Sequence, residues 1–372
     1  MKFVCVVAEY NPLHLGHVYH LDASRKAGDA TLVVMGGDFC QRGFSMMLDK
    51  YTRAAEAVKA GADIVVELPT LHAVHCAEQF ARGAMRLVDL LPDSVVSFGT
   101  ESGDIEALRR TASLLDEPSL SAHIRTLVSA GVAYPKARAE ALSTYAAQHN
   151  ISVVNLTLPN NILALEYIRA AKAAQDFFTV KRTTDYYASA PCASSSYIRR
   201  AIAEGTAVDG LVPPYVAEDI KRATPPADVL YLAALRAHDK SYFEGLTDNT
   251  EGLSNRVWQC AQDANTLLEA LEAAQTKRYT RARIARLFTS ALLNLRQADF
   301  DMAKHESAYF NVLAVKRDRT HLIGELNRYA QVYTTQAELR LGGISPSIDA
   351  RAHDVYRLLH AVDVHQSVRI VD

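Results

Sequence analysis

The chain lacks several features that would assign it to large classes of protein. Its five cysteines are scattered, at positions 5, 40, 76, 192 and 260, and no two of them form a CxxC pair. This spacing argues against a cysteine zinc site or a disulfide framework and suits a reducing cytosol. No apolar run approaches the roughly 20 residues that cross a bilayer. Near the amino terminus the chain is apolar for only five residues before Glu9, which is too short for a signal peptide. We therefore expect a cytoplasmic protein with no membrane partner.

An excess of charge of either sign is also missing. The 40 Lys and Arg residues nearly balance the 42 Asp and Glu residues, which gives a formal net charge of −2. The molecule as a whole therefore does not attract anions, and a polyanion such as RNA must meet a local basic patch.

Short apolar runs alternate with amphipathic stretches in the first 100 residues. The runs are rich in Val and Ile and cover residues 3–7, 30–35, 63–68 and 94–98. They are typical of buried parallel strands, and helix-like segments lie between them. The alternation predicts an α/β fold, an open parallel sheet of the Rossmann-like type with helices on both faces. Weaker strand signals follow at residues 151–156 and 177–180.

Glycine and proline cluster between about residues 205 and 227, and the pattern changes there. Beyond residue 228 the sequence is rich in Ala, Leu, Arg and Glu at helical spacing, and no strand-like run is expected. We therefore predict an α/β domain over residues 1–205, a linker over 206–227 and a mostly helical domain over 228–372.

The most informative motif is His14-Leu15-Gly16-His17, which follows the first strand and leads into a helix. This position is the carboxyl edge of the sheet, where α/β folds bind ligands. Gly16 leaves room for a nucleotide against the backbone, and a helix amino terminus favours phosphate. His14 and His17 can stabilise the charge that develops on an α-phosphoryl group under attack, so we predict that both are catalytic. The alternative is that the histidines cap or pack the helix.

A serine run before a second helix is a candidate for the same phosphate site. Ser194, Ser195 and Ser196 precede Arg199, whose guanidinium could reach phosphate oxygens. The alternative is that the hydroxyls only cap the helix.

These motifs resemble the HIGH-motif nucleotidyltransferase superfamily and, more narrowly, the bacterial tRNA(Met) cytidine acetate ligase family. Further matching segments occur in the family's order, at residues 37–43, 63–69, 98–104, 159–163, 181–182, 251–256 and 276–281. The chain differs from the usual family pattern at Leu15, at Gly36 and at Phe44-Ser45, all beside the expected site.

The resemblance implies an ATP-dependent ligase with an amino-terminal nucleotidyltransferase-like catalytic domain and a helical tRNA-binding domain. Such an enzyme activates acetate as acetyl-adenylate, releases pyrophosphate and acetylates the wobble cytidine of elongator tRNA(Met). Mg²⁺ is expected as the counter-ion of ATP, without dedicated protein ligands. The implied ATP-binding residues are Val7, Ala8, Glu9, Tyr10, Asn11, Pro12, Leu13, His14, Leu15, Gly16, His17, Val18, Tyr19, His20, Gly99, Asn160 and Arg182, to which we add Ser195, Ser196 and Arg199. Glu9 and Asp38 are candidates, by proximity alone, for accepting the proton of the cytosine amine.

A basic stretch from residue 276 to 295 contains no acidic residue. We predict that Lys277, Arg278, Arg281 and Arg283 bind tRNA, with Tyr279 available for stacking and Arg286 near the same side of a helix. The alternative is a solvated helix face. No DNA partner and no obligate protein partner is expected.

Two other functions remain open at this point. One is a nucleotidyltransferase that acts on a small phosphorylated acceptor, which leaves the helical domain without a role. The other is a noncatalytic RNA-binding protein with a vestigial nucleotide pocket, which the intact His14, Gly16, His17 and Arg199 argue against.

Overall fold

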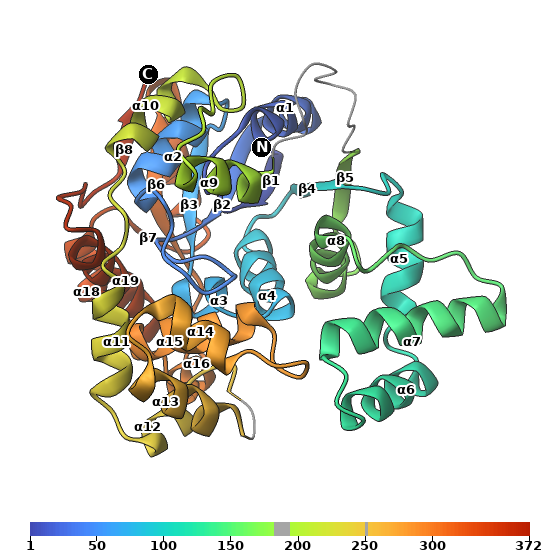
Figure 1. Cartoon of the computed structure of the whole chain (residues 1–372). Helices are drawn as coiled ribbons and strands as arrows, with labels where there is room; N and C mark the ends of the chain where they lie inside the picture. Colours follow the sequence, from blue (N-terminus) through green and yellow to red (C-terminus); the bar gives the residue numbers. More distant parts are fainter. Residues whose placement is uncertain (182–193, 250–251) are drawn as a thin grey trace.

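A single twisted sheet lies at the centre of the molecule (Figure 1). This computed structural model describes residues 1–181, 194–249 and 252–372. Within them the strand order is β5-β4-β1-β2-β3-β6-β7, and β8 also pairs with β6. The strands are β1 (Phe3–Ala8), β2 (Ala30–Gly36), β3 (Ile64–Leu68), β4 (Ser94–Thr100), β5 (Asp176–Lys181), β6 (Tyr309–Lys316), β7 (Gln331–Tyr333) and β8 (Arg369–Val371).

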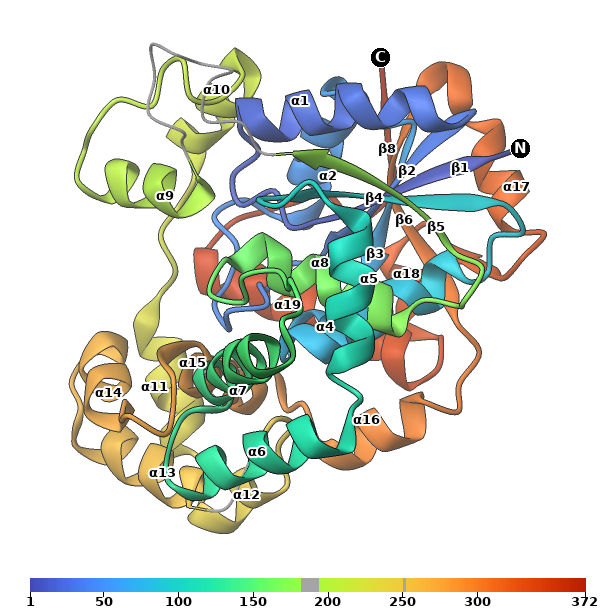
Figure 2. The same ribbon diagram turned by 90° about the vertical axis from the view of Figure 1, so that its right-hand side faces the viewer.

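Helices cover both faces of the sheet, because successive side chains of a strand point to opposite sides. On β1, Phe3 and Cys5 belong to one apolar core and Val6 to another. The first core includes residues of α4, α5, α7 and α8, and the second includes residues of α1, α2, α9 and α10 (Figure 2). These helices are α1 (Leu15–Ser24), α2 (Lys50–Lys59), α4 (Ala77–Val88), α5 (Ile105–Leu114), α7 (Tyr134–His149), α8 (Pro159–Ala170), α9 (Ser195–Ala203) and α10 (Pro214–Arg222).

A third core lies beside the sheet, between helices of the carboxyl-terminal half. It is built mainly from α11, α13, α14, α15 and α19, with Tyr231, Phe243, Phe288 and Phe300 among its buried aromatic residues. The helices whose bounds have not yet been given include those of this third core. They are α3 (Thr70–Ala73), α6 (Pro118–Ser129), α11 (Asp228–Arg236), α12 (Lys240–Glu244), α13 (Leu253–Asp263), α14 (Leu267–Ala274), α15 (Arg281–Leu293), α16 (Gln297–Ala303), α17 (His321–Leu326), α18 (Gln336–Arg340) and α19 (Ile344–His360).

The predicted fold class is confirmed: a mostly parallel sheet flanked by helices precedes a largely helical region. The expectation that strands end before residue 228 is wrong. The chain returns to the sheet with β6, which pairs antiparallel with β3, and then adds β7 and β8. A single apolar run of this length does not distinguish a strand from a buried helix, so β6 was not recognised among helical neighbours. The division at residues 205 and 228 stays a prediction.

The weak strand signal at residues 151–156 is also wrong. This segment is not a strand, although Val154 and Leu156 are buried in the first core. The Val154 N–H donates to the hydroxyl of Thr111 (3.1 Å) rather than to a strand neighbour. Burial of alternate side chains therefore reproduced the pattern of a strand without its pairing.

Within the described residues, no helix is both long and apolar enough to cross a membrane.

Candidate active site

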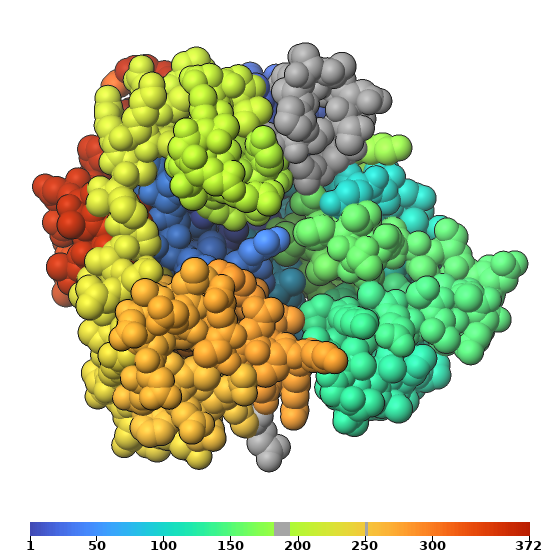
Figure 3. Space-filling view, viewed as in Figure 1, coloured from blue at the N-terminus to red at the C-terminus, as the bar shows by residue number. Residues whose placement is uncertain are grey.

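The His14–His17 motif lies where the order of strands reverses. β1 pairs in parallel with β2 on one side and with β4 on the other, so the chain moves outward in both directions from β1. Open α/β sheets bind ligands at the carboxyl ends of the strands beside such a switch point. Here that edge carries the β1–α1 turn and the end of β4, and it opens into a hollow on the surface (Figure 3).

His14 and His17 lie together at the amino terminus of α1. Their rings are stacked, with centroids 3.6 Å apart, and Tyr10 meets His17 edge-on at 4.9 Å. The backbone N–H of His14 donates to Nδ1 of His17 (3.3 Å). Since Nδ1 accepts this bond, a neutral His17 carries its proton on Nε2. His17 is therefore set up as a hydrogen-bond donor at a helix end that favours anions.

Gly16 has a local role in addition to the one expected from the sequence. A Cβ atom at this position would lie 3.0 Å from Cε1 and 3.1 Å from Nδ1 of His14. The missing side chain therefore gives space to the His14 ring, which is buried.

The serine run and Arg199 come to the same turn from α9. Arg199 donates to the backbone carbonyl of Asn11, and the Ser195 hydroxyl donates to the carbonyl of Pro12 (3.2 Å). Ser196 accepts a second bond from Arg199 (3.2 Å), while Ser194 caps α9 by accepting from the Tyr197 N–H (3.2 Å). The structure thus joins the two motifs that the sequence placed about 180 residues apart.

His20 differs from the other two histidines of the segment. Its Nε2 lies 3.0 Å from the hydroxyl of Ser97 on β4, which in turn lies 2.7 Å from that of Ser24. Burial lowers the pKa of His20 to about 4, so the ring is neutral at physiological pH. His20 packs α1 against the sheet and is not placed beside the rings of His14 and His17.

The other residues of the 7–20 segment divide between core and turn. Tyr10 and Leu13 are buried in the second core, against which Ala8 and Val18 also pack, and Val7 packs against the first. Asn11 holds the turn through its side chain, which accepts from the Met47 N–H (2.9 Å).

A second part of the edge is formed by the end of β4 and the start of α8. Gly99 pairs with Val180 of β5, and two residues later Glu101 accepts from the Asn160 side-chain nitrogen (2.8 Å) and from the Asn161 N–H (3.0 Å). A carboxylate can only accept, so the amide nitrogen of Asn160 faces Glu101 and its carbonyl faces the opposite side. Arg182, the remaining residue implied by the resemblance, lies outside the described residues.

The two carboxylates considered as proton acceptors differ sharply. Burial raises the pKa of Glu9, against the opposing effects of the Gln41 N–H bond (2.6 Å) and nearby arginines. Burial acts in the same direction on Asp38, but His353, 2.8 Å away, and Lys50 outweigh it and lower the pKa of Asp38 to about 2. Asp38 is therefore a weak base held in a buried ion pair, and Glu9 is the better candidate.

A buried set of charged residues supports this edge and was not recognised from the sequence. Arg53 donates to the carbonyls of Glu9, Gly36, Gly37 and Leu48, so it ties the ends of β1 and β2 together. The Lys50 ammonium lies 2.8 Å from the carboxylate of Glu67, which also accepts from Asn311 of β6 (2.5 Å). The signal in the sequence was Glu67 itself, a charge inside an otherwise apolar strand.

The predicted tRNA-binding residues are only partly available. Lys277, Arg278 and Arg281 are exposed, whereas Arg283 donates to the carbonyl of Asp248 (3.3 Å). Arg286 is buried and paired with the Asp248 carboxylate (2.7 Å). The expectation that Tyr279 is available for stacking is wrong, because its ring is buried in the third core. The helix α15 begins at Arg281, so Arg278 lies in the preceding loop.

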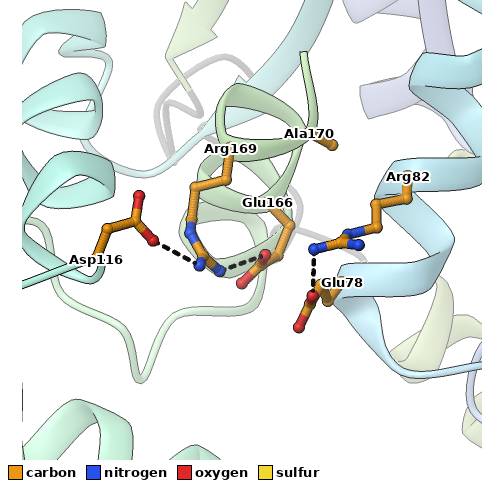
Figure 4. Close-up of a pocket in the computed structure, with 6 residues that line it drawn as sticks. All are labelled: Glu78, Arg82, Asp116, Glu166, Arg169 and Ala170. Carbon is orange, nitrogen blue, oxygen red and sulfur yellow. Dashed lines mark hydrogen bonds and ion pairs between the residues drawn. The ribbon is translucent and has the colours of Figure 1, made fainter. Parts of the chain in front are cut away.

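A separate cavity of about 170 Å³ lies between α4 and α8 (Figure 4). Its lining charges are already paired: Arg82 with Glu78 at 2.8 Å, and Arg169 with Asp116 at 3.0 Å and Glu166 at 3.2 Å. It offers a ligand no uncompensated charge, and we do not assign it a function.

Among the described residues, no group of three or more His, Cys, Asp or Glu could hold a metal ion.

Comparison with known proteins agrees with this arrangement. The HIGH Nucleotidyl Transferase family model matches residues 1–369. A protein named tRNA(Met) cytidine acetate ligase from Caldanaerobacter subterraneus subsp. tengcongensis is 35% identical over 320 residues, which are 79% of this chain and 79% of the relative. One with the same name from Syntrophotalea carbinolica is 33% identical over 398 residues, 96% of this chain and 94% of the relative.

The likeness extends to a solved structure. The crystal structure of Thermotoga maritima TmcAL bound with alpha-thio ATP matches with a TM-score of 0.87 at 26% sequence identity, and the match covers 100% of both chains. A family model over nearly the whole sequence, close relatives and a matching structure lead to one conclusion. The chain belongs to the HIGH nucleotidyl transferase family and, within it, to the tRNA(Met) cytidine acetate ligases.

Proposed function

We propose that the protein activates acetate with ATP and transfers the acetyl group to the wobble cytidine of elongator tRNA(Met). The observation that carries this proposal is the convergence of α9 on the β1–α1 turn. Arg199 and Ser195 bond to the backbone of Asn11 and Pro12, beside the stacked His14 and His17. The names of the relatives supply acetate and tRNA(Met) as the substrates.

The chemistry explains why ATP is needed. A carboxylate does not react with the weakly nucleophilic amine of cytosine, so it must first become a mixed anhydride. An acetate oxygen attacks the α-phosphorus of ATP, and pyrophosphate leaves. The exocyclic amine then attacks the acetyl carbon, AMP leaves, and the amine loses one proton.

The described residues have distinct roles in these steps. The Nε2–H of His17, the His14 ring and the Gly16 N–H in the first turn of α1 stabilise charge that develops on the α-phosphoryl group. Arg199 holds the turn and adds positive charge beside it. Asn160 presents its carbonyl to a donor on the nucleotide, and Glu9 accepts the proton of the attacking amine.

Mg²⁺ enters with ATP in this proposal. Among the described residues, no group of three or more His, Cys, Asp or Glu offers a dedicated site. They fit a metal that is held by the phosphates, which it would help to neutralise.

Acetate-dependent exchange of labelled pyrophosphate into ATP, measured without tRNA, tests the first half-reaction. We expect exchange by the wild-type protein and its loss in His17→Ala, while tRNA affinity is kept. The control is His321→Ala, which removes an exposed imidazole on α17, away from the β1–α1 turn. Absence of exchange in the wild-type protein at high acetate would sink the proposal, and exchange supported by a phosphorylated acceptor instead would favour a different transferase.

A further inference from the structure

An exposed arginine stands on a tight turn between β2 and α2. The Gly43 N–H donates to the Cys40 carbonyl (2.8 Å), and the Cys40 N–H donates to the Phe44 carbonyl (2.8 Å). Arg42 is at the tip of this turn and is exposed. Its guanidinium forms no hydrogen bond or ion pair with any other residue in the described ranges.

The turn is held firmly from the side of the active site. The Gln41 N–H donates to the carboxylate of Glu9 (2.6 Å), the residue that follows β1. The Gln41 side chain donates to the carbonyl of His75 (2.9 Å), in the segment that joins α3 and α4. The residue before Arg42 therefore cannot shift without breaking contacts to two elements of the α/β region.

The turn is held equally firmly from the side of the helical region. The Thr289 hydroxyl of α15 donates to the carbonyl of Gly43. Gly43 has a φ of 91°, and a Cβ atom on it would lie 2.2 Å from the backbone nitrogen of Arg286. The turn thus touches the backbone of α15, the helix that carries Arg281 and Arg283.

Arg42 is also within electrostatic reach of the β1–α1 turn. It is one of the cations that oppose the rise in the pKa of Glu9, and it contributes to the lowered pKa of Arg199 after the larger effect of burial. Arg42 therefore stands on a turn that bonds both to Glu9, beside the expected ATP site, and to α15. In Figure 3, blue atoms from the amino-terminal part of the chain reach the surface in the centre of this hollow, between α9 and the helices drawn in orange.

The exposure of Arg42 selects among the anions that the reaction involves. An exposed ion pair with one small carboxylate gives little affinity. The acetyl-adenylate formed from acetate must also be kept from water, so we expect acetate to be bound by an enclosed cation rather than an exposed one. A nucleic-acid backbone is different, because its phosphates are presented at the surface and each contact adds to several others. The planar guanidinium binds such a phosphate through two parallel bonds.

We propose that Arg42, fixed between Glu9 and α15, binds a backbone phosphate of the tRNA beside the base that is acetylated. The identity of the RNA rests on the proposed function, whereas the contact itself does not. The turn would then set the distance between the adenylate and the incoming base, because both sides of the site are bonded to it.

Direct binding of unmodified elongator tRNA(Met) transcript, without ATP or acetate, tests this contact at several salt concentrations. For Arg42→Ala we expect the dissociation constant to rise about tenfold at low salt, and the slope of log K against log[salt] to fall by about 1. Arg42→Lys keeps the charge and should lose less. The matched control is Arg222→Ala, which removes an exposed arginine that lies 3.6 Å from Asp219 of its own helix, α10.

Acetate-dependent pyrophosphate exchange by the same variants separates the possible outcomes. An unchanged tRNA affinity and salt slope in Arg42→Ala refute the proposal. A raised KM for acetate or ATP with an intact salt slope also refutes it, because Arg42 then serves a small substrate. Failure of the proposed function would appear differently, as absence of exchange in the wild-type protein, and would leave the binding measurement interpretable.

Discussion

The close approach of the Cys40–Gly43 turn to α15 predicts a large difference between two glycine substitutions. Gly43 and Gly131 have nearly the same φ, 91° and 89°. A Cβ atom on Gly131 meets nothing within 4 Å, whereas one on Gly43 would lie 2.2 Å from Arg286 N and 2.4 Å from Ala285 C. Both glycine-to-alanine substitutions place an L-residue at a positive φ, and only Gly43→Ala also makes a steric clash with α15.

The magnitudes follow from these two contributions. An L-residue in the left-handed region costs about 1–2 kcal/mol, which is the whole expected effect of Gly131→Ala. Gly43→Ala must in addition separate the turn from α15 by about an ångström, and overpacking of this kind costs about 1–3 kcal/mol. We therefore expect Gly43→Ala to lower the free energy of unfolding by about 2–5 kcal/mol, a large part of the ~5–15 kcal/mol typical of a domain.

Equilibrium unfolding in urea measures both variants under the same conditions. Gly43→Ala should lose at least ~1 kcal/mol more than Gly131→Ala. Because the turn bonds to Glu9 and carries Arg42, we also expect weaker tRNA binding by Gly43→Ala and not by Gly131→Ala. Equal losses of stability in the two variants would show that the turn and α15 are not packed as described, and the argument for a rigid Arg42 would fail with it.

Three further predictions concern the site and its support. Glu101→Gln allows the Asn160 side-chain amide to rotate by 180°, because glutamine can donate a hydrogen bond to the Asn160 carbonyl. The preference for ATP over ITP in pyrophosphate exchange should then fall about tenfold. An unchanged ratio would mean that Glu101 does not orient Asn160 toward the base. Arg278→Ala combined with Arg281→Ala should weaken tRNA binding and lower the slope of log K against log[salt] by about 2, while pyrophosphate exchange is kept. Arg283→Ala should weaken tRNA binding less, because Arg283 is already bonded to Asp248. An equal loss of tRNA affinity in Arg283→Ala would contradict this prediction. Asp38→Asn should lose about 2 kcal/mol at neutral pH, since the folded-state pKa of Asp38 is about 2 rather than the ordinary 3.8. That contribution is present above pH ~4 and disappears as the pH falls toward ~2, so the gap between the two proteins should close over this range, and a constant gap would assign the loss to packing.

Local sequence patterns predicted the elements that depend on local physics. The strands β1 to β4 follow each other at short intervals and are buried on both faces, so their apolar runs predict them directly. The position of the histidine motif followed from the first strand alone. The proximity of Gly16, His14 and His17 could be predicted because they are close in sequence and meet in one helical turn, and their catalytic role stays a prediction.

The features that the sequence did not reveal depend on contacts between distant segments. Nothing in residues 309–316 indicates that they pair with β3, about 240 residues earlier. The burial of Tyr279 and the pairing of Arg286 with Asp248 depend on how the helices pack, so the basic stretch looked like a more continuous stripe than it is. The same limit applies to Arg42, whose place between two regions follows only from the contacts of Gln41 and Gly43.

The late return of the chain to the sheet has a consequence for the timing of folding during synthesis. The motif at residues 14–17 leaves the ribosome early, but two of its supports do not: Asn311 of β6 bonds to Glu67, and His353 of α19 bonds to Asp38. Until those residues emerge, Lys50 pairs with Glu67 and bonds to Asp38, but both carboxylates lack the additional partners that complete their burial. We therefore expect a nascent chain that ends within the helical region to hold the ATP-binding edge in a loose form, and the edge to become rigid only near the end of translation.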